Sequence, residues 1–269
     1  MSREGIALLL GGLGLVLGSF IQAFVWRLHE NKDWVKGRSE CEHCHHQLGV
    51  GDLIPVVSWI MLRGRCRYCG TRLSREMPII ELVMGVLVAG SYWFWPQQLQ
   101  GQGLFDFVVW IIMLTGLVAM AIYDIKWLIL PDKIMYPLLY LALLSLASHI
   151  LFFHGGVDRV RTGVLAVLVG GGLFYVIYQL SQGKWIGGGD VKLGILIGLQ
   201  LGPLQAMIAI YAGALLGALS IIPLVFAKRL KLHRRQVIPF GPYLIMGIIL
   251  AKLFGIAMIN WYKRKYQLN

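Results

Sequence analysis

The sequence predicts an all-α polytopic membrane protein, with about eight transmembrane helices and a small cytoplasmic zinc-ribbon-like loop domain. Of its 269 residues, 57% are hydrophobic and 14% are charged, and the mean hydropathy is +0.68. This is more apolar than a soluble domain of that length requires. Several apolar stretches reach the roughly 20 residues that a helix needs to cross a bilayer core. The four cysteines lie together in one long polar loop between two such stretches.

The apolar stretches define the predicted spans. They fall at about 5–28, 78–96, 105–124, 133–153, 162–181, 190–202, 204–226 and 240–261. The first is too long for a secretory signal and has no small-residue cleavage site before Arg27, so we expect it to be retained. The sixth is short and ends at Gly202-Pro203. We therefore expect a first transmembrane helix at 1–28, a cytoplasmic basic loop at 29–77 and a transmembrane core at 78–269.

The basic residues set the expected orientation in the membrane. Lys and Arg gather in the loop 29–77 and in the segment 228–235, KRLKLHRR. Because positively charged loops stay in the cytoplasm, both should face inward, and the N-terminus should lie outside. The same alternation puts Lys263, Arg264 and Lys265 outside, against the rule. Either the last span is re-entrant or the larger basic loops dominate, and we favour the second.

The net charge of +12 at pH 7 does not by itself indicate nucleic acid as a partner. No RNA-binding or DNA-binding motif accompanies it. We expect the basic residues to face a bilayer with anionic headgroups instead, and we expect no nucleic-acid partner.

The cysteines form two CxxC pairs, Cys41-Glu-His-Cys44 and Cys66-Arg-Tyr-Cys69, separated by 21 residues. Such paired knuckles are typical of a structural zinc site, in which four thiolates hold one tetrahedral ion and metal binding supplies the folding energy. Four thiolates leave no open position for catalysis. Disulfides and an uncommitted loop remain alternatives, the first disfavoured by a cytoplasmic location. Nearby histidines are expected to be exposed loop residues: His43, His45 and His46.

Two acidic residues lie at the inner ends of predicted spans. Asp124 ends the run GLVAMAIYD, and Asp190 begins the sixth span. An interfacial anchor and a helix N-cap are the simple interpretations, and both stay open. Ionisable groups at membrane depth indicate function, however, and two carboxylates in one site do not readily both ionise. One can then act as acid and the other as base on a water molecule, which hydrolyses peptide bonds without a covalent intermediate.

Three glycines precede the second acid: Gly187, Gly188 and Gly189. An unwound glycine segment would let the backbone approach an extended peptide closely and leave N–H groups free to bind it. Two other acids have simpler expected roles. We expect Asp106 to be solvated near the outer surface, and Asp132, after Pro131, to be a helix N-cap.

Five segments of the chain match one family pattern. They are LGSFIQAFVWRL at 17–28, IPVVSWIMLRGRCRYCGTRLSREMPIIEL at 54–82, ILPD at 129–132 after Asp124, GGGDVKLGILIGLQLG at 187–202 and IPFGPYL at 238–244. Together they resemble the first span, the cytoplasmic loop, the two catalytic segments and the last segment of the bifunctional type 4 prepilin peptidase and N-methyltransferase family. The resemblance extends over most of the chain.

The resemblance implies a GxGD-type intramembrane aspartic peptidase with Asp124 and Asp190 as its catalytic pair and Gly187 and Gly189 as motif glycines. It implies an enzyme of the bacterial inner membrane that cleaves type IV prepilins or pseudopilins, of pilus or type II secretion systems. Cleavage would follow the glycine that ends the basic leader, at the cytoplasmic face. It further implies methylation of the new N-terminal amine with S-adenosylmethionine as the methyl donor.

The chain also departs from the family pattern. Gln22 stands where the family usually has Asn, and His29 where proline is common. These changes leave the aspartates untouched and bear on methyl transfer. Glu81, an acid at the start of an apolar span, is a candidate for holding a substrate amine, and a cap or an ion pair with Arg75 is the alternative. No GxGxG fingerprint locates the cofactor.

Two other functions remain as alternatives. One is a peptidase without methyltransferase activity. The other is a cation-coupled membrane transporter, in which paired acids and a glycine-broken helix bind a cation. Both acids are predicted at one face of the membrane instead of its midplane, which disfavours transport.

Overall fold

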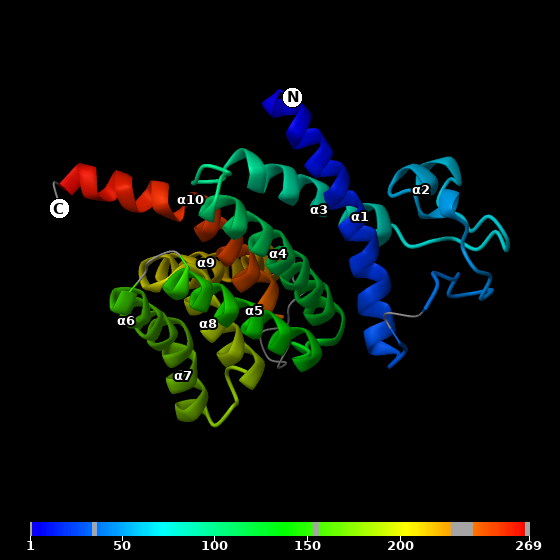
Figure 1. Cartoon of the computed structure of the whole chain (residues 1–269). Coiled ribbons are helices and arrows are strands. Elements are labelled where there is room, and N and C mark those ends of the chain that lie inside the picture. Colours follow the sequence, from blue (N-terminus) through cyan, green and yellow to red (C-terminus); the bar gives the residue numbers. More distant parts are fainter. Residues whose placement is uncertain (1, 34–36, 153–155, 227–238, 267–269) are drawn as a thin grey trace. The chain divides into compact units, whose positions relative to one another are not determined.

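The computed structural model describes residues 2–33, 37–152, 156–226 and 239–266. Within these ranges the chain is nearly all helical, with two isolated antiparallel bridges and no strand. It divides into an N-terminal unit, Met1–Trp95, and a C-terminal unit, Pro96–Asn269 (Figure 1). The all-α fold class is therefore confirmed. The predicted basic segment 228–235 lies outside the described residues.

The N-terminal unit has two long helices, one before and one after the cysteine loop in the sequence. They are α1 (Arg3–His29) and α3 (Glu76–Trp93), with the short turns η1 (Val50–Leu53) and α2 (Val57–Met61) between them. The C-terminal unit contains α4 (Gln102–Trp127), α5 (Asp132–Leu151), α6 (Gly156–Val167), the π-helical turn η2 (Leu168–Gly172), α7 (Leu173–Ser181), α8 (Gly188–Leu201), α9 (Pro203–Phe226) and α10 (Gly241–Tyr266).

In the described residues, seven helices are long and apolar enough to cross a membrane. One of them, Val160–Ser181, combines part of α6 with η2 and α7. The predicted sixth span corresponds to α8, which has 14 residues and is about 21 Å long. It is too short to count among the seven, so the expected eight spans become seven full-length helices and one short one. The protein is a multi-pass membrane protein.

Glycines bring helices into close contact in both units. A Cβ at Gly18 of α1 would lie 2.6 Å from Glu81 Cα in α3, so only glycine fits there. In the C-terminal unit, a Cβ at Gly198 of α8 would lie 2.1 Å from the Ala166 carbonyl oxygen. This contact seats α8 against α6. The α8 residues Leu193, Leu196 and Ile197 are buried.

The last span is one continuous helix that runs antiparallel to α4. Its first residue, Gly241, bonds to Asp124 near the end of α4, whereas Lys252 Nζ lies 5.9 Å from the ring centre of Trp110, nearer the start of α4. The re-entrant alternative is therefore wrong. The basic residues of the last turn, Lys263, Arg264 and Lys265, lie toward the end of the bundle opposite Asp124.

Candidate functional site

Asp124 lies near the carboxyl end of α4, and the helix ends at Leu128, its C-cap residue. Leu128 adopts a left-handed conformation (φ 56°) and donates its N–H to the Asp124 carbonyl, 2.8 Å away. The Asp124 side chain is nearly buried, 6% exposed. Its Oδ2 accepts a hydrogen bond from the Gly241 N–H at 3.1 Å. The first amide of α10 thus holds a carboxylate that the sequence places 117 residues earlier.

Asp190 lies in the first turn of α8. Its Oδ2 accepts a hydrogen bond from the N–H of Gly187, the N-cap residue, at 3.1 Å. In return, the Asp190 N–H donates to the Gly187 carbonyl, also at 3.1 Å. Asp190 is therefore the third helical residue and not the N-cap itself. Its local capping role uses one carboxylate oxygen and is compatible with a second, chemical role.

The structure brings the two aspartates together in the C-terminal unit. Leu130 packs against the first turns of both α8 and α10. A Cβ added at Gly189 of α8 would lie 3.0 Å from Leu130 Cβ, and one added at Gly241 of α10 would lie 3.1 Å from Leu130 Cδ2. Asp190 follows Gly189 directly and Asp124 is bonded to Gly241, so both carboxylates lie near Leu130 in one site. Two such groups share a proton more readily than they both ionise, so the pair can supply an acid and a base to one water molecule.

The glycine triplet is more regular than expected. Gly187 is extended (φ −79°, ψ 157°), but Gly188 and Gly189 already belong to α8, and none of the three has a positive φ. The expected unwound segment is thus wrong for two of the three residues. Gly188 nevertheless has no atom within 4 Å of where its Cβ would be. Its position leaves open space beside Asp190.

An ion pair fixes the start of α8 against the start of α5. Lys192 Nζ lies 2.5 Å from Asp132 Oδ1 and 4.9 Å from the ring centre of Tyr136. Asp132 was expected as the N-cap of α5, but Pro131 occupies that position and Asp132 is the first helical residue. The carboxylate is therefore used between helices. This pairing holds the segment that carries Asp190.

The four cysteines meet in the N-terminal unit. Their sulfur atoms all lie within 4.8 Å of one another, and the Cys41 and Cys69 sulfurs are 3.9 Å apart. A tetrahedral zinc with Zn–S bonds of 2.3 Å separates its sulfurs by about 3.8 Å, so the cluster fits the ion. The set Cys41, Cys44, Cys66 and Cys69 is free of disulfides. The three histidines are exposed, as expected, and the His46 ring stacks on Tyr68.

The cysteine thiols differ in acidity. Hydrogen bonds from the hydroxyl and backbone of Thr71 lower the pKa of Cys69 to about 6. A hydrogen bond from the His46 backbone favours the Cys44 thiolate, but burial and the neighbouring thiols outweigh it and raise the pKa of Cys44 to about 11. At neutral pH, without a cation, the four thiols do not all ionise. A divalent ion supplies the charge that lets them do so.

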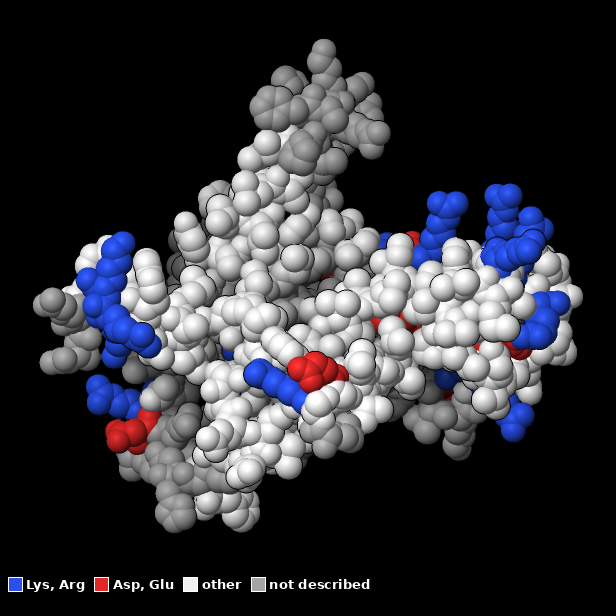
Figure 2. Space-filling model, turned by 90° about the horizontal axis from the view of Figure 1, so that it is seen from above, with Lys and Arg blue, Asp and Glu red and all other residues white. Residues whose placement is uncertain are grey.

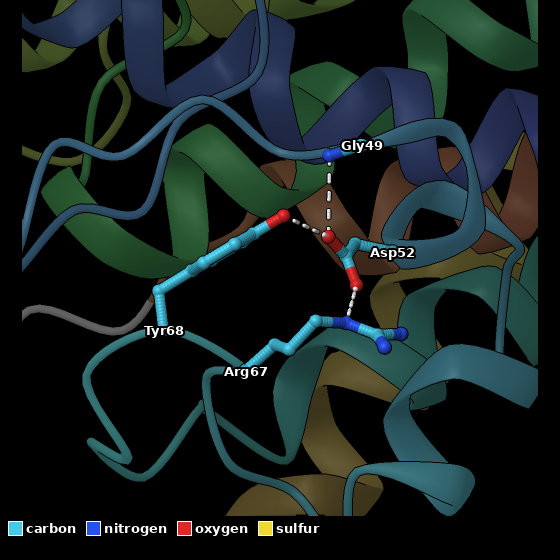
Figure 3. A network of polar contacts seen from close by, with 4 residues as sticks. All are labelled: Gly49, Asp52, Arg67 and Tyr68. Atoms are coloured by element: carbon cyan, nitrogen blue, oxygen red, sulfur yellow. Dashed lines mark hydrogen bonds and ion pairs between the residues drawn. The ribbon is translucent and has the colours of Figure 1, made fainter.

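A carboxylate network joins η1 to the second knuckle (Figure 3). Asp52 Oδ1 lies 2.6 Å from Arg67 Nε, and its Oδ2 accepts hydrogen bonds from the Gly49 N–H at 3.1 Å and the Tyr68 hydroxyl at 3.2 Å. Burial opposes ionisation of Asp52, but these donors prevail and lower its pKa. Both residues that follow Cys66 are thus tied to the segment after the first knuckle. Asp52 positions the two knuckles for one ion.

Glu81 lies in the second turn of α3 and is nearly buried, 7% exposed. Its Oε2 accepts the Val56 N–H at 2.7 Å, so it neither caps α3 nor pairs with Arg75. Val56 has φ 63°, a left-handed conformation that strains a β-branched residue. Glu81 holds that strained turn. Its assignment to a substrate amine stays a prediction.

Known proteins match the chain along most of its length. The bacterial peptidase A24 N-terminal domain matches residues 13–95, and the type IV leader peptidase family matches residues 111–222. A prepilin leader peptidase/N-methyltransferase from Bacillus subtilis is 33% identical over 93% of this chain and 94% of its own. The chain belongs to the prepilin leader peptidase/N-methyltransferase family. Asp124 and Asp190 both lie within the stretch that matches type IV leader peptidases.

Other members of this family cover the chain to a similar extent. A prepilin leader peptidase/N-methyltransferase from Burkholderia pseudomallei is 32% identical over 90% of this chain and 84% of its own. One from Stutzerimonas stutzeri is 29% identical, over 90% and 89%. No solved structure matches the chain. The family is thus shown over both units.

Gly241 contacts Asp124 in the structure, but the sequence did not predict it as part of the site. The signal was present, because IPFGPYL is one of the family-like segments, but nothing local showed that its glycine faces Asp124. A Cβ at residue 241 would lie 2.6 Å from Asp124 Oδ2. Position 241 therefore requires glycine, because any side chain there would collide with the Asp124 carboxylate.

Proposed function

We propose that the protein is a membrane aspartic endopeptidase that cleaves the basic leader from type IV prepilins or pseudopilins, with Asp124 and Asp190 as the catalytic pair. The carrying observation is geometric: two carboxylates from separate helices, each held by a backbone amide, lie where Leu130 packs against the starts of both α8 and α10. The names of the relatives, all prepilin leader peptidases, support the substrate class.

The proposed reaction needs no covalent intermediate. One ionised carboxylate takes a proton from water as its oxygen attacks the peptide carbonyl carbon, and the protonated partner donates to the carbonyl oxygen. The C–N bond then breaks, and the leaving amine takes a proton from the dyad. The Gly241 and Gly187 amides hold the carboxylates in place while protons move. The open space beside Gly188 is where an extended substrate backbone is proposed to lie.

Cleavage is proposed at the cytoplasmic face of the bacterial inner membrane, after the glycine that ends the leader. The helix polarity is compatible with this location, since Asp124 and Asp190 lie at the same end of the bundle as the start of α10. Membership of the named family disfavours the transporter alternative. Substrates of type IV pili and of type II secretion share the required leader chemistry.

The second proposed activity is methylation of the new N-terminal amine. When bound, S-adenosylmethionine supplies an electrophilic methyl group for that amine. The names of the relatives support this activity. No set of described side chains identifies the cofactor site, and no step is assigned to particular residues. Transfer of a labelled methyl group from S-adenosylmethionine to the cleaved pilin tests it, and absence of transfer by active peptidase leaves the peptidase alone.

A structural zinc ion is proposed at the four cysteines. The sulfur separations and the neighbouring Asp52 network suit one tetrahedral ion. Elemental analysis of the purified protein should give about one zinc per chain. Stripping the metal should unfold the loop without moving the aspartates. A preparation that is fully active and stable without metal would remove this part of the proposal.

The decisive experiment compares three Asp→Asn variants in reconstituted membranes. Asp124→Asn and Asp190→Asn should each abolish prepilin cleavage while the protein remains folded. Asp106→Asn, on the same helix α4 as Asp124, is the matched control and should retain cleavage. Thermal unfolding of each variant separates loss of chemistry from loss of fold. Substantial cleavage by either dyad variant would exclude the proposed mechanism.

A further inference from the structure

The segment around α2 exposes apolar side chains in an otherwise polar loop. Met61 is 76% exposed and Ile60 63%, and Val57 and Ile54 are about half exposed. We call these four residues the α2 ridge. Val57, Ile60 and Met61 follow a spacing of three and four, so they lie on one face of the turn. Trp59 instead packs beside Gly64, where a Cβ would meet the indole at 2.8 Å. A contiguous apolar patch of this kind marks an interaction surface.

The hydrogen bond from Val56 fixes the depth of the ridge. Val56, one residue before α2, donates its N–H to Glu81. Glu81 is the sixth residue of α3, so it lies about 7.5 Å along the helix from Glu76. The 18 residues of α3 extend about 27 Å, close to the thickness of a bilayer core. The ridge is therefore pinned at the level where α3 enters the membrane.

A second contact joins α1, the other long helix of the N-terminal unit, to the start of α3. Gln22 Nε2 in α1 donates to the Met77 carbonyl at the start of α3, 2.9 Å away. Both helices that flank the loop are thus joined near their loop-side ends. Interfacial segments typically bury their apolar face about 5–10 Å into the boundary between headgroups and acyl chains. The depth of Glu81 falls in that range.

The charge around the ridge complements anionic headgroups. Residues 54–75 contain five arginines and no acidic residue. Arg63 and Arg65 follow α2 directly and are exposed. Figure 2 shows blue basic side chains protruding from a mostly white surface, with a few red acidic side chains among them. Apolar side chains flanked by arginine are the composition of a segment that binds a membrane surface.

We infer that the α2 ridge inserts into the headgroup region of the bilayer and that Arg63 and Arg65 bind anionic lipid beside it. The occupant of the patch is lipid, not a protein partner. This anchor holds the four-cysteine loop flat against the membrane surface. The hydrogen bond from the Val56 N–H to Glu81 sets the depth of the α2 ridge in the bilayer. The inference does not depend on the aspartate chemistry.

The test uses a photoreactive residue in the full-length protein, reconstituted in vesicles of phosphatidylethanolamine and phosphatidylglycerol. Met61→benzoylphenylalanine reports on the ridge, and His43→benzoylphenylalanine, an exposed residue in the first knuckle, is the matched control. Mass spectrometry identifies the adducts after irradiation. Lipid adducts should form at residue 61 at least about tenfold more often than at residue 43. Adducts at residue 61 that join residues 96–269 or an added prepilin would overturn the inference.

A second arm tests the headgroup. Replacing phosphatidylglycerol by phosphatidylcholine should lower the lipid adducts at residue 61 about 25-fold, because each of the two arginines near an anionic surface contributes about a factor of five in binding. Arg63→Gln with Arg65→Gln should remove this dependence on lipid charge. Equal adduct yields in both lipids, with the arginines intact, would overturn the anionic part of the inference.

Discussion

The two ends of α4 each carry an aspartate, buried at Asp124 and partly buried at Asp106, and the two have different partners. Asp106, near the start, is 11% exposed and lies 2.8 Å from His149 Nε2 of α5. Gln102 bonds the other ring nitrogen of His149 at 2.9 Å, so the imidazole links two residues at the start of α4. Asp124, near the end, accepts a backbone amide from Gly241, and within the described residues no basic side chain pairs with it.

This difference is what the proposed mechanism requires of a structural acid, Asp106, and a chemical one, Asp124. The Asp106 carboxylate is paired with a histidine whose other ring nitrogen is bonded to the Gln102 amide, so removing the carboxylate leaves a largely buried ring nitrogen unpaired. A carboxylate held only by an amide, beside a second carboxylate, keeps the capacity to exchange a proton. The expectation that Asp106 would be solvated is therefore wrong. Its side chain is only 11% exposed, and its partner His149 joins α4 to α5.

The largest expected effect is at the uncompensated end. Asp124→Asn should lower prepilin cleavage by at least about a thousandfold, as expected for loss of a group that exchanges protons with the reacting water. The same change should leave the free energy of unfolding unchanged or raise it by about 1 kcal/mol, because it removes a poorly compensated charge. Cleavage kinetics and denaturant unfolding measure both. A loss of stability above about 2 kcal/mol would contradict the comparison.

Gly241 should give the second largest effect. Gly241→Ala places a methyl group 2.6 Å from Asp124 Oδ2, so the carboxylate must move. We expect kcat to fall about 10- to 100-fold with little change in KM, since misplacement by about 1 Å costs rate.

The control for Gly241 lies on the same helix. At Gly255 an added methyl meets only the flexible Gln205 side chain, at 3.2 Å. Gly255→Ala should keep kcat within about twofold, because the Gln205 side chain can move aside and the position is far along α10 from Gly241, the residue that contacts Asp124. Equal losses in both variants would show a packing effect on α10 instead of a positioning role for Gly241.

The compensated end should respond in stability instead of rate. Asp106→Asn or His149→Leu should lower the free energy of unfolding by about 1–3 kcal/mol, because each leaves buried polar partners unpaired. Cleavage by the folded fraction should remain near the wild-type rate. Thermal unfolding in detergent and cleavage assays at low temperature measure the two quantities. A full loss of cleavage in a folded Asp106→Asn protein would erase the distinction between the two ends.

The smallest expected effect is at the ion pair beside the dyad. Lys192 and Asp132 are 31% and 54% exposed, so water screens their attraction. Lys192→Gln should cost at most about 1 kcal/mol in stability. It should lower kcat only a few-fold, because the α8 backbone and Gly187 still hold Asp190. The double change Asp132→Lys with Lys192→Asp should restore most of that loss.

The sequence predicts the helices and the identity of the chemical residues because those signals are local. Apolar length indicates each span, CxxC spacing indicates the four-cysteine cluster, and a charge at a span end indicates Asp124 and Asp190. The partners of these residues are not local. Asp106 and His149 lie 43 residues apart, and Asp124 and Gly241 lie 117 apart. No pattern of composition shows which of two buried acids meets a histidine and which meets an amide.

The helical state of Gly188 and Gly189 was also beyond local reasoning. Glycine disfavours helix, so a run of three predicts an irregular segment. Tertiary contacts overrule that preference, because α8 is seated by Gly198 against Ala166 and by Lys192 against Asp132. The use of Glu81 to hold Val56 was hidden for the same reason. Its partner is a backbone group in a turn that the sequence does not predict.

The amide that holds Asp124 belongs to the last helix of the chain. During synthesis both aspartates therefore enter the membrane before the residue that positions one of them has been made. A nascent chain that ends before residue 241 carries the reactive groups without their final geometry. Under the proposed mechanism, proteolytic competence arrives only when α10 inserts, so the order of translation would itself keep the unfinished enzyme from cutting its neighbours.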